Sequence, residues 1–149
     1  MIEEDVLYAL EEGRIDTYTG GWDYWGNQLF KEDINKYEDK SAFSSGILLF
    51  NNCDIIRTLF MNIRTHMQIE KPPYICYDQP YIVYGAKTMG IMNNKTLNEW
   101  AVINDLNIYG NKTLIHFAGG VGIHIHKYIN MMQYLKLLLF LKCIEMLKN

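Results

Sequence analysis

The sequence is poor in the residue types that hold a protein together without a hydrophobic core. It has three cysteines and three prolines among 149 residues, and no Cys-x-x-Cys pair. Cys53, Cys76 and Cys143 are widely spaced and lie in apolar surroundings, which favours reduced buried thiols in a cytoplasmic protein over a disulfide scaffold. Since a chain of this length buries enough surface for its own core, we expect a single domain over residues 1–149.

Basic charge and long apolar runs are also scarce. The formal net charge is -3 and lysine and arginine form no dense block, which argues against a nucleic-acid partner. Acidic residues directly follow Met1, so no secretory leader is expected. The most apolar stretch, residues 131–147, is interrupted by two lysines and a glutamate and is shorter than the roughly 20 residues of a membrane span. We expect no membrane span and a packed or partner-facing C-terminal helix over residues 130–148.

Strand-like and helix-like segments alternate along the chain, which predicts an α/β fold. A helix is expected after Asn52 as its cap and should end at the prolines that follow Lys71; another should start with Asp78 as its cap. Between the first strand and residue 40 the chain is rich in glycine and aromatic residues, which predicts a long ordered and functional loop. The predicted strands are Val6–Leu10, ending in a turn at Glu11–Gly13, Ala42–Phe50 with Ile47–Phe50 buried, Trp100–Tyr109 and Thr113–Phe117.

A histidine at the end of a predicted strand is followed by glycines and a lysine. The group consists of His116, Gly119, Gly120, Gly122 and Lys127. An imidazole can bind a metal ion, glycines let backbone N–H groups approach an anion, and a lysine can neutralise it. The combination suits a metal-bound diphosphate, while a loop with turn glycines and an ordinary histidine is the simpler interpretation.

Two nearby histidines offer another interpretation of the same stretch. His124 and His126 could join His116 in a zinc site, but no obvious fourth ligand lies close by in the sequence.

Two further groups of polar residues border predicted elements. Asp78 and Gln79 stand at a helix start, where they could stabilise a developing positive charge and orient sugar hydroxyls, or where Asp78 could simply cap the helix. Ser44, Ser45 and Gly46 enter a strand, where they could bind a ligand at the sheet edge or allow close backbone packing.

The order of these motifs resembles the second half of the family-eight-like glycosyltransferases of the GT-A fold, a Rossmann-like fold with a mixed sheet. The resemblance is strongest to short nucleotide-sugar transferases of large DNA viruses. It rests on the Leu-Tyr-Ala-Leu-Glu-Glu-Gly strand end, a Tyr-Trp-Gly loop, Phe-x-Ser-Gly-Ile, Asp-Gln-Pro and His-Phe-x-Gly-Gly-x-Gly, which occur in this order from Val6 to about Lys127.

The resemblance implies retaining transfer of a hexose from a UDP-sugar to a glycan or protein acceptor, with Mn²⁺ as cofactor. It implies that His116 binds the metal, that Asp78 and Gln79 lie beside the anomeric carbon, and that the sugar contacts Ser44 and Ser45. By the same resemblance, Gly119, Gly120, Gly122 and Lys127 would hold the diphosphate, and Trp25 would contact substrate.

One motif of such enzymes is missing, because no two aspartates of this sequence stand two residues apart. Mn²⁺ prefers several oxygen ligands, and one imidazole does not replace two carboxylates. We therefore expect an acceptor-side half that is inactive alone and that needs a complementary N-terminal half. Apolar strand edges left unpaired would favour self-association.

A non-catalytic carbohydrate-binding module is the alternative function. Trp22, Tyr24 and Trp25 could stack on sugar rings without any metal or nucleotide, and such a module would bind free glycan.

Overall fold

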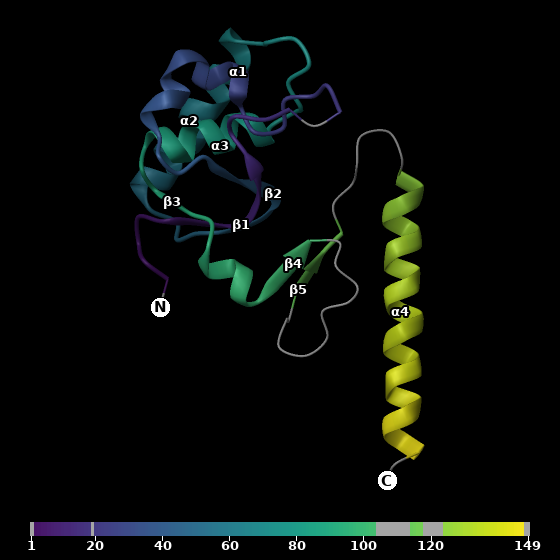
Figure 1. Ribbon diagram of the computed structural model, residues 1–149. Coiled ribbons are helices and arrows are strands. Elements are labelled where there is room, and N and C mark those ends of the chain that lie inside the picture. Colours follow the sequence, from purple (N-terminus) through teal and green to yellow (C-terminus); the bar gives the residue numbers. More distant parts are fainter. Residues whose placement is uncertain (1, 19, 104–113, 118–123, 148–149) are drawn as a thin grey trace. The chain divides into compact units, whose positions relative to one another are not determined.

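The computed structural model describes residues 2–18, 20–103, 114–117 and 124–147 (Figure 1). The chain divides into two units, Met1–Glu99 and Trp100–Asn149, and each is described by itself. The expected single domain over residues 1–149 stays a prediction.

A mixed three-stranded sheet forms the centre of the first unit. It consists of β1 (Leu7–Arg14), β2 (Ser41–Leu49) and β3 (Met92–Asn93) in the order β2-β1-β3. β1 pairs with β2 in antiparallel and with β3 in parallel orientation. Together with the helices packed on it, this sheet confirms the predicted α/β class.

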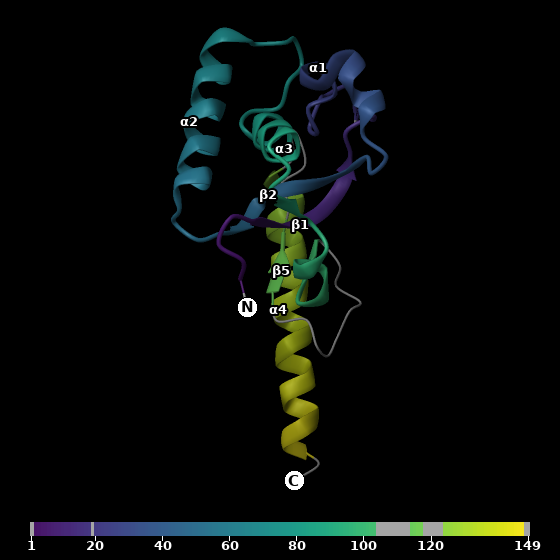
Figure 2. The same ribbon diagram turned by 90° about the vertical axis from the view of Figure 1, so that its left-hand side faces the viewer.

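Helices α1 (Asn27–Phe30), α2 (Asp54–Ile69) and α3 (Gln79–Thr88) lie on one side of the sheet, as the two views in Figures 1 and 2 agree. Short 3₁₀ helices follow α1 at Lys31–Lys36 (η1) and precede the second unit at Thr96–Glu99 (η2). The core lies between the helices and the sheet, and its fully buried members include Leu7, Ala9, Phe43, Leu59 and Val83.

β1 is longer than its apolar pattern predicts. The expected turn at Glu11–Gly13 is wrong, because the strand continues to Arg14 and pairs there with Ser41 of β2. Backbone pairing continues past the last buried side chain, so the end of the apolar run does not mark the end of the strand.

β2 is present as predicted, but its buried part lies elsewhere. Residues 42–44 are buried, whereas Leu49 and Phe50 are each 38% exposed. The expectation that Ile47–Phe50 would be buried is therefore wrong. β2 is an edge strand of this sheet, so its far end has less covering protein.

α2 and α3 start and stop close to where the sequence predicts. α2 ends at Ile69, before the two prolines, and buries Ile56, Leu59 and Ile63 at helical spacing. Its N-cap is Cys53 instead of the predicted Asn52, whose side-chain oxygen accepts a hydrogen bond from Arg57 Nε at 3.0 Å. Asp78 is the N-cap residue of α3, as expected, but its side chain makes no capping hydrogen bond.

The long loop before β2 is organised around Asp23. The Asp23 side chain is fully buried and accepts hydrogen bonds from the backbone N–H groups of residues 25, 26, 27 and 28, at 2.7–3.2 Å. This carboxylate caps the start of α1, since the first N–H groups of a helix have no partner within the helix. The predicted loop therefore contains α1 and η1.

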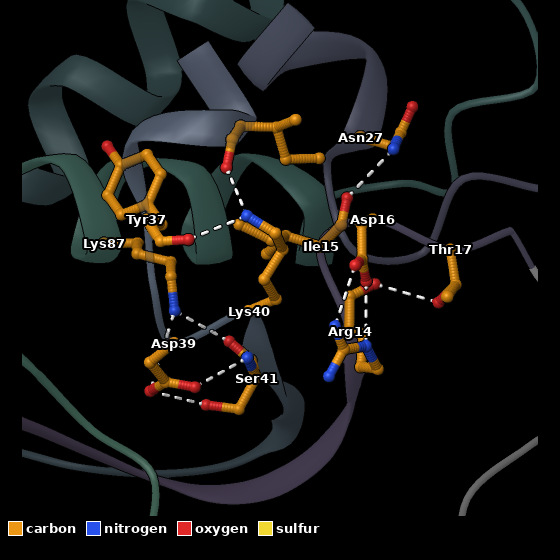
Figure 3. A network of polar contacts seen from close by, with 11 residues as sticks. Arg14, Ile15, Asp16, Thr17, Asn27, Tyr37, Asp39, Lys40, Ser41 and Lys87 are labelled. Atoms are coloured by element: carbon orange, nitrogen blue, oxygen red, sulfur yellow. Dashed lines mark hydrogen bonds and ion pairs between the residues drawn. The ribbon is translucent and has the colours of Figure 1, made fainter. Parts of the chain in front are cut away.

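A second polar network fixes the start of β2 (Figure 3). Lys87 of α3 is buried and donates to the carbonyl oxygen of Ser41 at 2.9 Å, with the Asp39 carboxylate 3.9 Å away. Burial lowers the pKa of the Lys87 ammonium. The network connects α3 to the sheet near the residues that carry the candidate site.

The second unit contains two short parallel strands, β4 (Ala101–Ile103) and β5 (Leu114–His116), and the helix α4 (His124–Leu147). α4 begins six residues before the expected start at residue 130 and carries many exposed apolar side chains, Leu139 and Phe140 among them. Within the described residues, no helix combines the length and apolarity needed to cross a membrane.

Replacing Asp23 by alanine should destabilise the protein by about 3 kcal/mol or more, because buried N–H groups lose their acceptor. Urea unfolding followed by circular dichroism measures the loss. Asp54→Ala is the matched control, since the Asp54 side chain is 97% exposed and pairs with Arg57 on the surface; it should cost less than about 1 kcal/mol. Equal unfolding midpoints for Asp23→Ala and the unmodified chain would contradict the assigned role of Asp23.

Candidate functional site

The site residues of the first unit gather where the pairing of β1 and β2 is interrupted. Ala9 is opposite Leu48 and Leu10 is opposite Ser44, so residues 45–47 of β2 are left over in the register. Such a bulge bends the strand and re-aims its side chains, and bulges are common beside functional sites.

The Gln79 side chain connects this bulge to α3 and to the aromatic loop. Its Oε1 accepts from the backbone N–H of Ser45 at 2.9 Å and from the Ser45 hydroxyl at 3.3 Å. Its Nε2 donates to the carbonyl oxygen of Tyr24 at 3.2 Å. Three segments far apart in the sequence therefore meet at one amide group.

Ser44 belongs to a second polar group of the site. Its side chain is buried and hydrogen-bonds to the half-buried Glu12 carboxylate at the end of β1. Burial raises the pKa of the Glu12 carboxyl, and the hydrogen bond from Ser44 partly opposes this change. Glu12 and Ser44 thus form a carboxylate–hydroxyl pair beside the Ser45–Gln79 contact.

Trp25 packs inside the first unit. The side chain is 6% exposed, so its ring offers little surface for stacking, and the expected contact of Trp25 with substrate stays a prediction. The ring packs directly on Gly13, whose φ is +67° and where a Cβ atom would lie 2.2 Å from the indole. Only glycine fits at this position. Among the described residues, Trp25 Nε1 is the buried side-chain polar atom without a hydrogen-bond partner.

Gly26 brings the aromatic loop against the start of α3. Its φ is +86°, and a Cβ atom there would lie 2.8 Å from the carbonyl oxygen of Pro80. The Tyr-Trp-Gly and Asp-Gln-Pro motifs are therefore in backbone contact.

Asp78 is exposed and lies next to this contact. Its carbonyl oxygen accepts from the N–H groups of Tyr81 and Ile82 at 3.1 Å, which anchors the first turn of α3. Its carboxylate is open to solvent at the helix start, where a negative charge is favoured.

His116 and Lys127 belong to the second unit. His116 is half-buried at the end of β5. Burial lowers the pKa of its imidazole, and the nearby charge of Lys127 lowers it further. A neutral imidazole has a lone pair with which to bind a metal ion. Gly119, Gly120 and Gly122 lie outside the described residues, as do the side chains of His124 and His126.

The described residues do not complete a manganese site. Nowhere in ranges 2–18, 20–103, 114–117 and 124–147 do three His, Cys, Asp or Glu side chains gather closely enough to hold a metal ion. Mn²⁺ prefers several oxygen ligands, and His116 provides one nitrogen.

Comparison of the chain with protein-family models, with curated proteins and with solved structures gives no match.

Asp23 and Glu12 are two residues to which the sequence analysis assigned no role. Asp23 stands three residues before Gly26, a spacing at which a carboxylate can accept from backbone N–H groups of a following turn. Glu12 stands two residues after Leu10, at the end of a run of four buried residues of β1, and a carboxylate so close to a buried run is a signal of a polar site.

Replacing Glu12 by glutamine should change how stability depends on pH. Because its folded-state pKa is raised, the folded chain holds this proton more tightly than the unfolded chain, so stability is lost as pH rises through the folded pKa. Glu12→Gln should match the unmodified chain under acidic conditions and exceed its stability at neutral pH. Urea titrations from about pH 4 to about pH 8 test this.

Glu4→Gln, at an exposed position, serves as the control. A difference between Glu12→Gln and the unmodified chain that stays constant across this pH range would refute the burial effect.

Proposed function

We propose that this chain is the acceptor-side part of a GT-A glycosyltransferase, which transfers a hexose from a UDP-sugar with retention. The observation that carries the proposal is the hydrogen bonding of Gln79 to Ser45 and Tyr24. The Asp-Gln-Pro, Phe-x-Ser-Gly-Ile and Tyr-Trp-Gly motifs, which resemble those of family-eight-like enzymes, are joined by that one side chain.

The residues of the cluster have different roles in this proposal. Both ends of the Gln79 amide are occupied by protein contacts, so Gln79 positions the bulge of β2. The exposed Asp78 carboxylate is free to face the donor sugar and to stabilise positive charge that develops at its anomeric carbon. Glu12 and Ser44 offer a carboxylate and a hydroxyl, the groups that bind sugar hydroxyls.

The resemblance also implies residues that would hold the diphosphate. His116 is the proposed metal-binding residue, and Lys127 would neutralise phosphate charge beside it. When bound, Mn²⁺ would supply a counter-charge for the leaving diphosphate. Since this sequence has no Asp-x-Asp pair, the remaining carboxylates would come from a complementary N-terminal half.

Nuclear magnetic resonance of the full chain tests the proposal. On titration with UDP-glucose or UDP-galactose in the presence of Mn²⁺ and a polypeptide with an Asp-x-Asp nucleotide-binding half, the Ser45 amide and Gln79 carboxamide signals should shift. Gln79→Ala should weaken this binding about tenfold, because the bulge loses the contacts that hold it. Gln133→Ala, at an exposed position of α4, should leave it unchanged.

A turnover assay forms the second part of the test. The chain alone with Mn²⁺ should release no UDP, and release should begin when a polypeptide with an Asp-x-Asp nucleotide-binding half is added. Shifts confined to other residues, or turnover by the chain alone, would overturn the proposal as stated.

A further inference from the structure

Two exposed aromatic rings lie on the two chain segments that lead to Tyr24 and to Gln79. Trp22 and Tyr74 pack edge to face, with ring centroids 6.3 Å apart, and are 38% and 67% exposed. We call this pair the aromatic platform. Tyr77, 84% exposed, lies between Tyr74 and α3. Exposed aromatic groups of this kind mark interaction surfaces.

The backbone holds the platform in place. Asp23, next to Trp22, forms a parallel bridge with Ile75, next to Tyr74. The Asp23 N–H donates to the Tyr74 carbonyl oxygen, and the Cys76 N–H donates to the Asp23 carbonyl oxygen, both at 2.9 Å. Because the buried Asp23 carboxylate also fixes the start of α1, the segments that carry Trp22 and Tyr74 are held in a defined conformation.

The backbone of the tyrosine segment is held in an unfavourable conformation. Tyr74 and Tyr77 have φ angles of +61° and +52°, a region that residues with a Cβ atom rarely adopt. Both side chains are exposed, so no burial of the rings compensates for this cost. A conformation of this type, kept by surrounding hydrogen bonds, is common where a surface binds a ligand.

The platform and the polar cluster are linked through neighbouring residues of the chain. Trp22 lies two residues before Tyr24, whose carbonyl oxygen accepts from Gln79 Nε2, and Tyr77 lies two residues before Gln79 itself. Rings for apolar contact and hydroxyl, amide and carboxylate groups for hydrogen bonding are therefore held by the same pair of segments.

We infer that the aromatic platform binds the acceptor and that the acceptor is a saccharide. The inference rests on the proposed function. A pyranose has an apolar C–H face that fits against an aromatic ring and a rim of hydroxyls that need polar partners. Asp78, the residue after Tyr77, is acidic and exposed, which disfavours an anionic ligand. A protein acceptor would need a larger apolar surface than this ring pair.

Calorimetric titration of the full chain with maltohexaose, cellohexaose and chitohexaose tests the inference. At least one should bind, and the Trp22 indole N–H resonance should shift in the same titration. Trp22→Ala and Tyr74→Ala should each weaken binding about tenfold, whereas Tyr74→Phe, which keeps the ring, should retain it.

Matched controls come from the second unit. Trp100 and Tyr128 are 56% and 64% exposed, and their alanine variants should bind as the unmodified chain does. Circular dichroism spectra of all variants should agree, which separates lost binding from lost folding.

The outcomes separate the two proposals. Absence of binding by all three saccharides, or equal binding by Trp22→Ala, overturns the platform even if UDP-hexose shifts Ser45 and Gln79. Saccharide binding that depends on Trp22, without any response to UDP-hexose, supports the platform and overturns the transferase. Binding of an unrelated protein by the platform, with none of the saccharides bound, overturns the saccharide assignment.

Discussion

The hydrogen bonding of backbone N–H groups to the buried Asp23 carboxylate is the interaction on which the first unit depends. The carboxylate accepts from four consecutive backbone N–H groups, and the backbone of Asp23 bridges the segment before α3. A buried charge is costly unless it is fully hydrogen-bonded, and here backbone donors compensate for that cost. One residue thereby orders the glycine-rich loop and joins it to the start of α3.

The geometry of the polar cluster follows from that constraint. With the loop fixed, the Tyr24 carbonyl oxygen meets Gln79, and Gln79 in turn holds Ser45 in the bulge of β2. Glu12 of β1 and Ser44 of β2 complete the group. Hydrogen-bonded polar side chains and exposed rings, linked through neighbouring residues of the chain, suit a ligand with both apolar and hydroxyl surfaces.

Periodicity in the sequence predicts α2 because its buried residues repeat every helical turn. It does not predict the exposure of Ile47–Phe50, since that depends on the edge position of β2. The sequence pattern does not predict α1 and η1. The start of α1 depends on hydrogen bonds that backbone N–H groups donate to Asp23, and such bonds leave no pattern in the side chains. The sequence also does not predict which tryptophan side chain is exposed, because Trp25 is buried by packing against Gly13. The metal-binding role of His116 remains a prediction of the resemblance.

Amide hydrogen exchange tests the central role of Asp23 most directly. The N–H groups of residues 25–28 should exchange as slowly as those of β1, because all four are bound to one buried carboxylate. In Asp23→Asn, where one oxygen is replaced by an amide group, these N–H groups should exchange faster while β1 stays protected. Exchange of residues 25–28 at the rate of an unstructured peptide in the unmodified chain would contradict this account.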